Sequence, residues 1–223
     1  MKTKAITLDV VKADPRVIAV VRKADEIAAL IGLTEHGERH VSLVARNAAR
    51  ILTNLEHPQR QADLAAIAGY LHDIGNALNR SMHAQSGALL ATNILTSLGM
   101  PVDEVLEISS AIGHHHEADG AAISRVAAAL ILADKGDVHR SRVRNPDMIK
   151  FDIHDRVNYS VEESSIQVDR EKREITLKLT IDLSVSSVME YFEIFLSRML
   201  ASTKAAQFLD TTFGFIVNGN RLF

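Results

Sequence analysis

Apolar residues recur at three- and four-residue spacing over the first 140 positions, a pattern that predicts helices with one buried face. Asp14 followed by Pro15 indicates the start of the first helix, because Asp caps a helix and Pro fits its first turn. Asp63 and Ser124 are candidate N-caps for two later helices. The predicted helices cover residues 17–31, 38–55, 64–73, 86–98, 102–112 and 125–135.

From residue 157 onward the pattern changes to an alternation of apolar and polar positions, which indicates strands. Ile166 and Val168 mark one strand, and residues 175–183 mark the next. The charged segment 169–174 joins them. This part of the chain therefore predicts a β-hairpin.

Residues 188–209 form an amphipathic helical pattern, and residues 212–217 are typical of a short strand. Before the change of pattern, Asn145-Pro146-Asp147 is a turn signal. We therefore predict a mainly α protein in two parts. A helical bundle domain over residues 1–150 is followed by a small α+β C-terminal lobe over residues 151–223.

The composition excludes several kinds of partner and site but does not indicate a particular function. With 25 Lys and Arg against 28 Asp and Glu, the net charge of -3 provides no general attraction to nucleic-acid polymers or anionic membranes. The absence of Cys excludes disulfides, thiolate zinc sites and cysteine nucleophiles. Residues 1–14 contain no apolar signal-peptide core, and the uncharged stretch 81–102 is too polar for a membrane span, so we expect a cytoplasmic protein.

The histidines and two aspartates are the residues that suggest chemistry. His40 lies on the inward face of the second helix, and His72-Asp73 ends the buried third helix. Asp134 lies inside an apolar helix, where an unpaired carboxylate would be costly. Residues 114–116 are three consecutive histidines. Imidazole and carboxylate together suit divalent transition metals, and converging helices are a usual way to collect such ligands.

Each of these residues also has a plainer interpretation when it is taken alone. A single inward His such as His40 is more often a hydrogen-bonded core residue than a ligand, and the same holds for Asp134. The run 114–116 is also compatible with a solvated loop. A metal site accounts for all of them at once, which favours it over separate explanations.

The order and helical context of these residues resemble the HD superfamily of metal-dependent phosphohydrolases. The signature of that superfamily is a His on one helix, an adjacent His-Asp pair on a later one, and a distant Asp. Here His40, His72-Asp73 and Asp134 correspond to it, and residues 72–75 read HDIG. The resemblance covers residues 34–140.

Further residues are similar to the HD-GYP phosphodiesterases, whose site is larger. Met82-His83 with Gly87 matches one part of that pattern, and His115-His116-Glu117 followed by Asp119-Gly120 matches another. Asp137 repeats the Asp-x-x-Asp spacing after Asp134. The additional histidines imply a site for two metal ions.

Three departures from the HD-GYP pattern concern its substrate specificity. Residues 121–123 are Ala-Ala-Ile in place of Gly-Tyr-Pro, Asn76 stands where Lys is expected, and the loop 117–120 is one residue shorter. The resemblance therefore implies the metal site but does not extend to cyclic dinucleotides as substrates.

The resemblance implies two divalent cations, with Asp73 as the bridging ligand. Iron or manganese is favoured, and Zn, Ni, Co or Mg is compatible with the same ligand types. One cation would be held by His40, His72 and Asp134, and the other by His83, His115 and His116. His114, Glu117 and Asp137 are further candidate ligands.

With such a site the implied activity is phosphoester hydrolysis. A metal-activated hydroxide would attack the phosphorus of a phosphomonoester or phosphodiester, expected to be a nucleotide or another small phosphorylated metabolite. His72, Asp73 and Lys135 are the candidate catalytic residues. Arg140, Arg142 and Arg144 are candidates for binding the phosphate, because Arg pairs with phosphate through two hydrogen bonds, although a basic stretch after a helix is often only solvated.

Two other functional classes share these features. Some HD-fold proteins resemble mixed-valence di-iron oxygenases that use the same ligands, and a third class keeps the pocket only for ligand sensing. The C-terminal helix adds an unassigned apolar stripe, which suits the protein core or a homodimer contact. The stripe consists of Val188, Tyr191, Phe192, Phe195, Leu196 and Met199.

Overall fold

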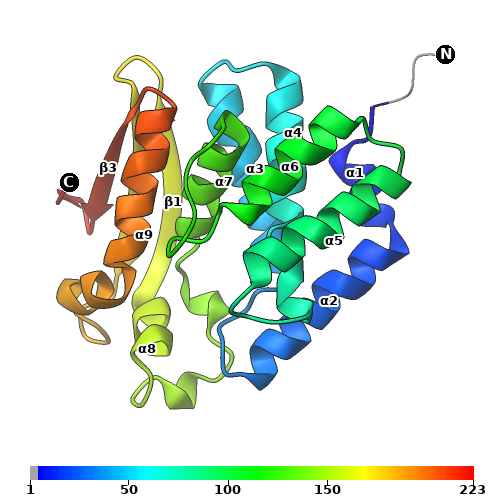
Figure 1. Cartoon of the computed structure of the whole chain (residues 1–223). Coiled ribbons are helices and arrows are strands. Elements are labelled where there is room, and N and C mark those ends of the chain that lie inside the picture. The colour runs from blue at the N-terminus through cyan, green and yellow to red at the C-terminus, as the bar shows by residue number, and fades with distance from the viewer. Residues whose placement is uncertain (1–4) are drawn as a thin grey trace.

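The computed structural model describes residues 5–223, so residues 1–4 of the N-terminal segment that was inspected for a signal peptide lie outside it. The fold is mainly α with a small C-terminal sheet, as the sequence predicts (Figure 1). The helices of the bundle are α1 (Leu8–Ala13), α2 (Pro15–Leu30), α3 (Glu38–Asn54), α4 (Gln59–Leu71), α5 (His83–Ser97), α6 (Val102–Gly113) and α7 (Arg125–Lys135).

The predicted caps of α2 and α7 are confirmed. The Asp14 carboxylate accepts a hydrogen bond from the Arg16 backbone, and Ser124 accepts one from the Ala127 backbone. The predicted cap at Asp63 is wrong, since α4 already begins after Pro58 and Asp63 lies in its second turn. Proline fixes its own backbone angle near the value that suits a helix start, so the earlier signal prevails.

The C-terminal part consists of α8 (Ile153–Ser160), β1 (Val161–Asp169), β2 (Glu174–Ile181), α9 (Val188–Phe208), β3 (Thr212–Val217) and β4 (Asn220–Arg221). The sheet order is β1-β2-β3-β4. β1 and β2 form the predicted antiparallel hairpin, and α9 is the crossover that returns the chain to β3, parallel to β2. Helix α8 and strand β4 are additions that the pattern does not predict.

The two parts share one hydrophobic core, with α7 at its centre. Nine of the eleven residues of α7 are buried, and the helix packs against α3, α4 and α6 as well as against α9 (Figure 1). Buried residues of the bundle and of the sheet belong to a single cluster. The boundary near residue 150 stays a prediction about chain organisation, and the core is continuous across it.

Helix α9 uses most of its apolar stripe inside this core. Tyr191, Phe195 and Met199 are buried, and the Tyr191 ring stacks on Phe215 of β3. Leu196 is 52% exposed and lies outside the packed face. The structure therefore assigns the stripe mainly to the core, while a homodimer stays a prediction. Among residues 5–223, no helix combines the length and the apolar character that crossing a bilayer requires.

Candidate metal centre

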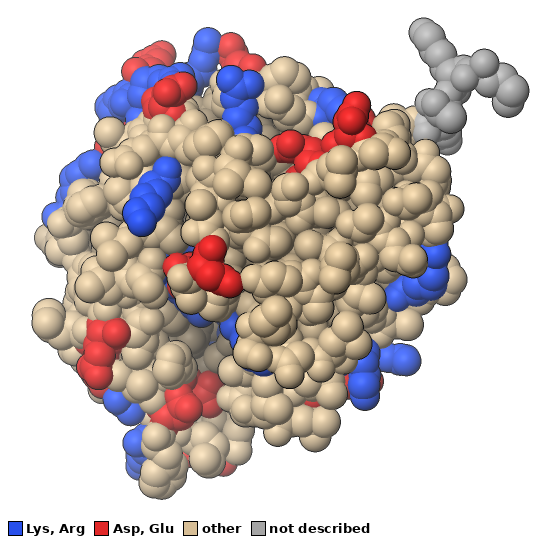
Figure 2. Space-filling model, viewed as in Figure 1, with Lys and Arg blue, Asp and Glu red and all other residues tan. Residues whose placement is uncertain are grey.

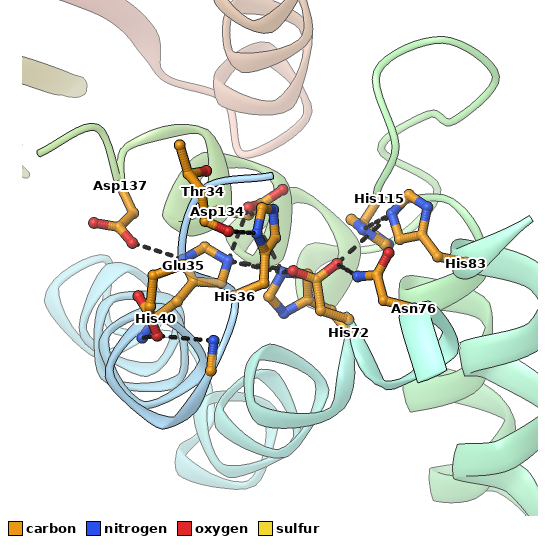
Figure 3. Close-up of polar contacts among 12 residues, drawn as sticks. Thr34, Glu35, His36, His40, His72, Asn76, His83, His115, Asp134 and Asp137 are labelled. Carbon is orange, nitrogen blue, oxygen red and sulfur yellow. Dashed lines mark hydrogen bonds and ion pairs between the residues drawn. The ribbon is translucent and has the colours of Figure 1, made fainter. Parts of the chain in front are cut away.

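The centre lies where three helices of the bundle meet. His40 is in the first turn of α3, His72 and Asp73 follow the last turn of α4, and Asp134 is in the last turn of α7. Figure 3 shows His40, His72 and Asp134 directed toward one another. Gly69 permits this approach, because a Cβ there would come within 2.9 Å of the Ala45 backbone on α3. The small residue lets α3 and α4 pack closely enough for their histidines to meet.

Gly75, the last residue of HDIG, brings in α5. A Cβ at this position would lie 1.9 Å from the backbone oxygen of His83, so only glycine lets the turn rest against the start of α5. His83 is thereby placed beside Asp73. The motif thus positions a residue of another helix in addition to supplying its own His-Asp pair.

Four side chains form a first cluster of potential ligands. The Nε2 atoms of His40 and His72 are 3.3 Å apart. Asp73 Oδ2 lies 3.5 Å from His40 Nε2 and 3.3 Å from His72 Nε2. Asp134 Oδ1 lies 3.5 Å and 3.6 Å from the same two nitrogens. Atoms of His40, His72 and Asp134 are close enough to share one metal ion.

A second cluster lies on the other side of Asp73. The Nε2 atoms of His83 and His115 are 3.2 Å apart, and Asp73 Oδ1 lies 3.7 Å from His83 Nε2. His72, Asp73 and His115 form a second group that could share an ion. The two oxygens of Asp73 therefore face different clusters, which is the arrangement expected of a bridging carboxylate.

The orientation of the imidazoles tests whether these residues suit a metal. Nδ1 of His72, His83 and His115 lies 2.8, 2.8 and 2.6 Å from the backbone oxygens of Gly69, Arg80 and Ile112. A carbonyl oxygen can only accept, so each Nδ1 donates its hydrogen and each Nε2 is free to coordinate in the neutral ring. Ligating histidines characteristically have this support, so the donor set fits divalent cations.

Asp137 supports His40 in the same way. Its Oδ2 lies 2.6 Å from His40 Nδ1, on the far side of the ring from Asp73, and it also pairs with Arg39 at 2.8 Å. The Asp-x-x-Asp spacing suggests that Asp137 is a ligand, but the structure does not place it among the ligand atoms. Its contacts assign it to orienting His40.

Without a cation, protons balance the charge of the first cluster. Burial lowers the pKa of His40, but its contacts with Asp134, Asp137 and Asp73 outweigh this effect and raise the pKa to about 9. For His72 the opposing effect of burial is likewise outweighed by Asp73 and Asp134, and its pKa is about 10. Burial raises the pKa values of Asp73 and Asp134, but both lie well below the ordinary range. The imidazoliums of His72 and His40 lower that of Asp73, and the charge of Lys135, followed by the same imidazoliums, lowers that of Asp134.

The histidines of the second cluster have the opposite tendency. Burial lowers the pKa of His83, and it lowers that of His115 further, with the charge of His72 adding to the effect. Their rings are therefore neutral at physiological pH. Neutral imidazole is the form that binds a metal.

The consecutive histidines 114–116 separate in space. His115 is buried in the second cluster. The His116 ring centroid lies 5.0 Å from that of His83, so it borders the cluster from a half-buried position. His114 hydrogen-bonds to the Ser110 backbone oxygen and is exposed, so the structure does not bring it to the centre.

The basic residues proposed for phosphate binding also separate. Lys135 is 4% exposed, and its Nζ pairs with Asp134 Oδ2 at 2.7 Å and with Glu117 Oε2 at 2.5 Å. Arg142 lines the cleft over the centre. Arg140 pairs instead with Glu162, and Arg144 with Asp25, so neither reaches it.

Glu117 lies beside the clusters and links two basic residues, although the sequence suggests it as a ligand. Besides Lys135, it accepts a hydrogen bond from Arg198 Nε at 3.3 Å. Burial raises the pKa of Glu117, but the charges of Lys135 and Arg198 outweigh this and lower it to about 2. Glu117 therefore connects the centre to α9.

Three residues that line the cleft are missing from the sequence-based prediction. They are His36, Arg80 and Arg198. Arg198 is the charged residue of an otherwise apolar turn of α9, a signal that was available in the sequence. Figure 2 shows a hollow on this face, with Lys or Arg side chains set back in it and Asp or Glu side chains near its edges.

Comparison with known proteins agrees with this geometry. Residues 37–138 match the family model of the HD domain, so this part of the chain is an HD domain. The matched segment contains every residue of both clusters. The chain is also similar to the uncharacterized protein MJ1020 of Methanocaldococcus jannaschii, with 27% identity over 186 residues that cover 74% of this chain and 70% of that protein.

Proposed function

We propose that this protein is a metal-dependent phosphohydrolase that cleaves a phosphomonoester or phosphodiester of a small metabolite. The position of Asp73 is the strongest support for this proposal. Its two carboxylate oxygens face two clusters of convergent histidine Nε2 atoms. The HD domain match over residues 37–138 supports it, as do the cationic side chains that line the same cleft.

The first cation would be held by His40, His72, Asp73 and Asp134, and the second by Asp73, His83, His115 and His116. Iron or manganese suits this mixture of imidazole and carboxylate. When bound, divalent cations supply Lewis acidity that makes a water nucleophilic near neutral pH and offsets the charge of the phosphate. In the first cluster, two carboxylates and two neutral imidazoles would balance the charge of one divalent ion.

The chain's own basic residues would bind and orient the phosphate. Arg142 uses part of its donor set on the backbone oxygens of Asp137 and Glu35, which fixes its guanidinium at the cleft and leaves other N–H groups free. Arg198 approaches from α9 and Arg80 from the loop before α5. Guanidinium groups match phosphate oxygens geometrically.

Lys135 has a different role from the arginines. Its ammonium group is held between Asp134 and Glu117, directly beside the first cluster. This fixed positive charge would oppose the negative charge that develops on the departing oxygen. Lys135 is therefore proposed to stabilise the leaving group.

A matched set of variants tests the proposal. Asp73→Asn and His72→Gln should each lower phosphate release from a panel of phosphoesters by more than about 100-fold, the upper range for residues that only support a ligand. His114→Gln, the control, should leave it unchanged, and circular dichroism should show the same helix content in all three. Oxygen uptake with an organic substrate and without phosphate release would contradict the proposal in favour of oxygenase chemistry.

A further inference from the structure

A cavity of about 200 Å³ continues from the metal centre toward the C-terminal part of the chain. It shares four residues with the cleft over the centre: His36, Arg80, Arg142 and Arg198. Its other walls come from the loop after α2 and from the region of α8, and α9 closes it with Phe195. A ligand whose phosphate lies at the centre would therefore extend its organic part into this cavity.

Asn158 of α8 lines the end of the cavity that lies away from the metal centre. It is 4% exposed, and its Nδ2 donates to the His154 backbone oxygen at 2.8 Å. The His154 oxygen can only accept, so the atom of the Asn158 amide that faces it must be Nδ2 and the other atom is Oδ1. Oδ1 is buried and has no hydrogen-bond partner within the described residues. A buried acceptor of this kind is unfavourable unless a bound group donates to it.

Two carboxylates line the same end of the cavity. Asp152 uses Oδ1 to cap α8, accepting from the backbone of His154 and Asp155, so its second oxygen is left for a ligand. Asp155 is partly buried, and its pKa is raised by that burial and by the neighbouring Asp152. With Asn158, these groups form a set of acceptors opposite the arginines. The complementary ligand surface is rich in hydrogen-bond donors.

The cavity provides little for a nucleobase. Its phenyl ring, that of Phe195, is 1% exposed and is covered by the Arg198 guanidinium, 4.4 Å from the ring centroid. Phe195 therefore offers no open face to a base, which leaves only the imidazoles of His36 and His154 for stacking. The volume is also below the range of about 300–1,000 Å³ that is usual for sites of larger ligands.

Donor-rich ligands of this size carry hydroxyl groups or an ammonium group. An ammonium group would be attracted by Asp152 and Asp155, but it would share the cavity with three guanidinium groups, whose like charges oppose it: Arg80, Arg142 and Arg198. Hydroxyl groups avoid this repulsion, and a carboxylate accepts from neighbouring hydroxyls as it does in ribose recognition. The combination favours a neutral polyhydroxyl group.

We infer that the substrate is a monophosphate of a small polyol of about pentose size. The inference rests on the proposed function, and it adds the substrate class. The phosphate lies among Arg80, Arg142 and Arg198 beside the metal centre. The hydroxyl groups donate to Asn158 Oδ1 and to the carboxylates of Asp152 and Asp155.

Kinetics with matched esters test this assignment. Ribose 5-phosphate should be hydrolysed with a kcat/KM at least tenfold above those of phenyl phosphate, phosphoethanolamine and AMP. In Asn158→Leu the ratio of kcat/KM for ribose 5-phosphate to that for phenyl phosphate should fall at least tenfold. Asn158→Asp keeps an acceptor but loses the donor to the His154 backbone oxygen, so it should retain only part of that ratio. Asp169→Asn, a change on β1 that lines neither the cleft nor the cavity, should leave it unaltered.

A binding measurement separates this inference from the proposed function. Calorimetry should show that ribose 5-phosphate binds the wild-type protein at least tenfold more tightly than inorganic phosphate, and that Asn158→Leu removes this difference. Phosphate release from other esters without any preference for ribose 5-phosphate overturns the polyol assignment and leaves the hydrolase intact. Preference for phosphoethanolamine or AMP overturns it too. Selective binding without turnover supports the polyol site and contradicts the hydrolase.

Discussion

The imidazoles of His40 and His72 lie among carboxylates, which outweigh the effect of burial and raise their pKa values to about 9 and about 10. At neutral pH both rings of the metal-free protein therefore carry a proton on the nitrogen that faces the cluster. A cation must replace those protons, because only neutral imidazole coordinates. The same atoms thus serve two states of the protein: a protonated metal-free state and a neutral metal-bound one.

Binding of the first cation should therefore release protons. Calorimetric titration of metal-free protein at pH 7, in buffers that differ in ionisation enthalpy, should show release of about two protons per cation, one from each ring. Affinity should consequently rise with pH. His114→Asn should leave the release unchanged because that side chain is exposed and outside the clusters. Heats that do not depend on the buffer would show that His40 and His72 are already neutral.

The same protonation sets the pH dependence of the metal-free protein's stability. Because the folded pKa values of His40 and His72 exceed the unfolded value of 6.5, their contribution is complete below about pH 6.5 and is lost as pH rises through 9 to 10. Urea unfolding of the metal-free protein should show a falling free energy of unfolding between pH 7 and 10. A free energy that rises over this interval would contradict the protonated cluster.

Among the elements, the packing of α4 on α3 determines whether the first cluster can form. At Gly69 and Gly75 the neighbouring backbone leaves no space for a Cβ: Gly69 lies against α3, and Gly75 against α5. The HDIG motif is therefore partly a packing motif. Its glycine brings His83 into the centre.

Gly69→Ala should destabilise the fold, because the added Cβ would collide with the backbone of α3. The usual cost of such overpacking is about 1–3 kcal/mol or more. Gly113→Ala is the matched control. A Cβ there would lie at an ordinary 3.7 Å from Ala88, and alanine favours helix, so stability should hold or rise by up to about 1 kcal/mol. Urea unfolding compares the two. Equal stabilities would show that α3 and α4 can separate without cost.

The long elements were predictable from sequence because each buries one face over several turns. Helix α1 has 6 residues and α8 has 8, so both are shorter than the window of about 11–18 residues over which the helical pattern is recognised. Strand β4 has 2 residues and follows from a turn, in which Asn218 and Gly219 both have positive φ. Asp63 failed as a cap because Pro58 begins α4 a turn earlier.

The candidate site was predictable only for the residues that belong to a recognisable motif. His40, His72-Asp73, His83, His115 and Asp134 are recognisable in order along the chain, and the structure brings them together. The charge of Arg198 in an apolar turn is visible in the sequence, but its place at the cleft depends on how α9 packs against α7, which no local pattern encodes. For the same reason Arg142 could not be separated in advance from Arg140 and Arg144.

For the whole molecule, this packing means that the C-terminal part completes the cleft. Arg198→Ala should raise KM for a phosphoester about 10- to 100-fold, since a hydrogen bond to a charged group contributes about 1.5–3 kcal/mol. Arg198→Lys should retain part of the affinity through its charge. Arg221→Ala, which removes an exposed pair with Glu174 on the sheet, is the control and should have no effect. An unchanged KM in Arg198→Ala would place the substrate away from α9.

Asp73 is proposed to bridge two cations, and elemental analysis of the purified protein counts the cations that are bound. Wild-type protein, prepared with and without oxygen, should contain about two equivalents of transition metal per chain, and His83→Ala or His115→Ala should contain about one. Wild-type protein with one equivalent, unchanged in both variants, would contradict a two-cation centre. The centre would then consist only of His40, His72, Asp73 and Asp134.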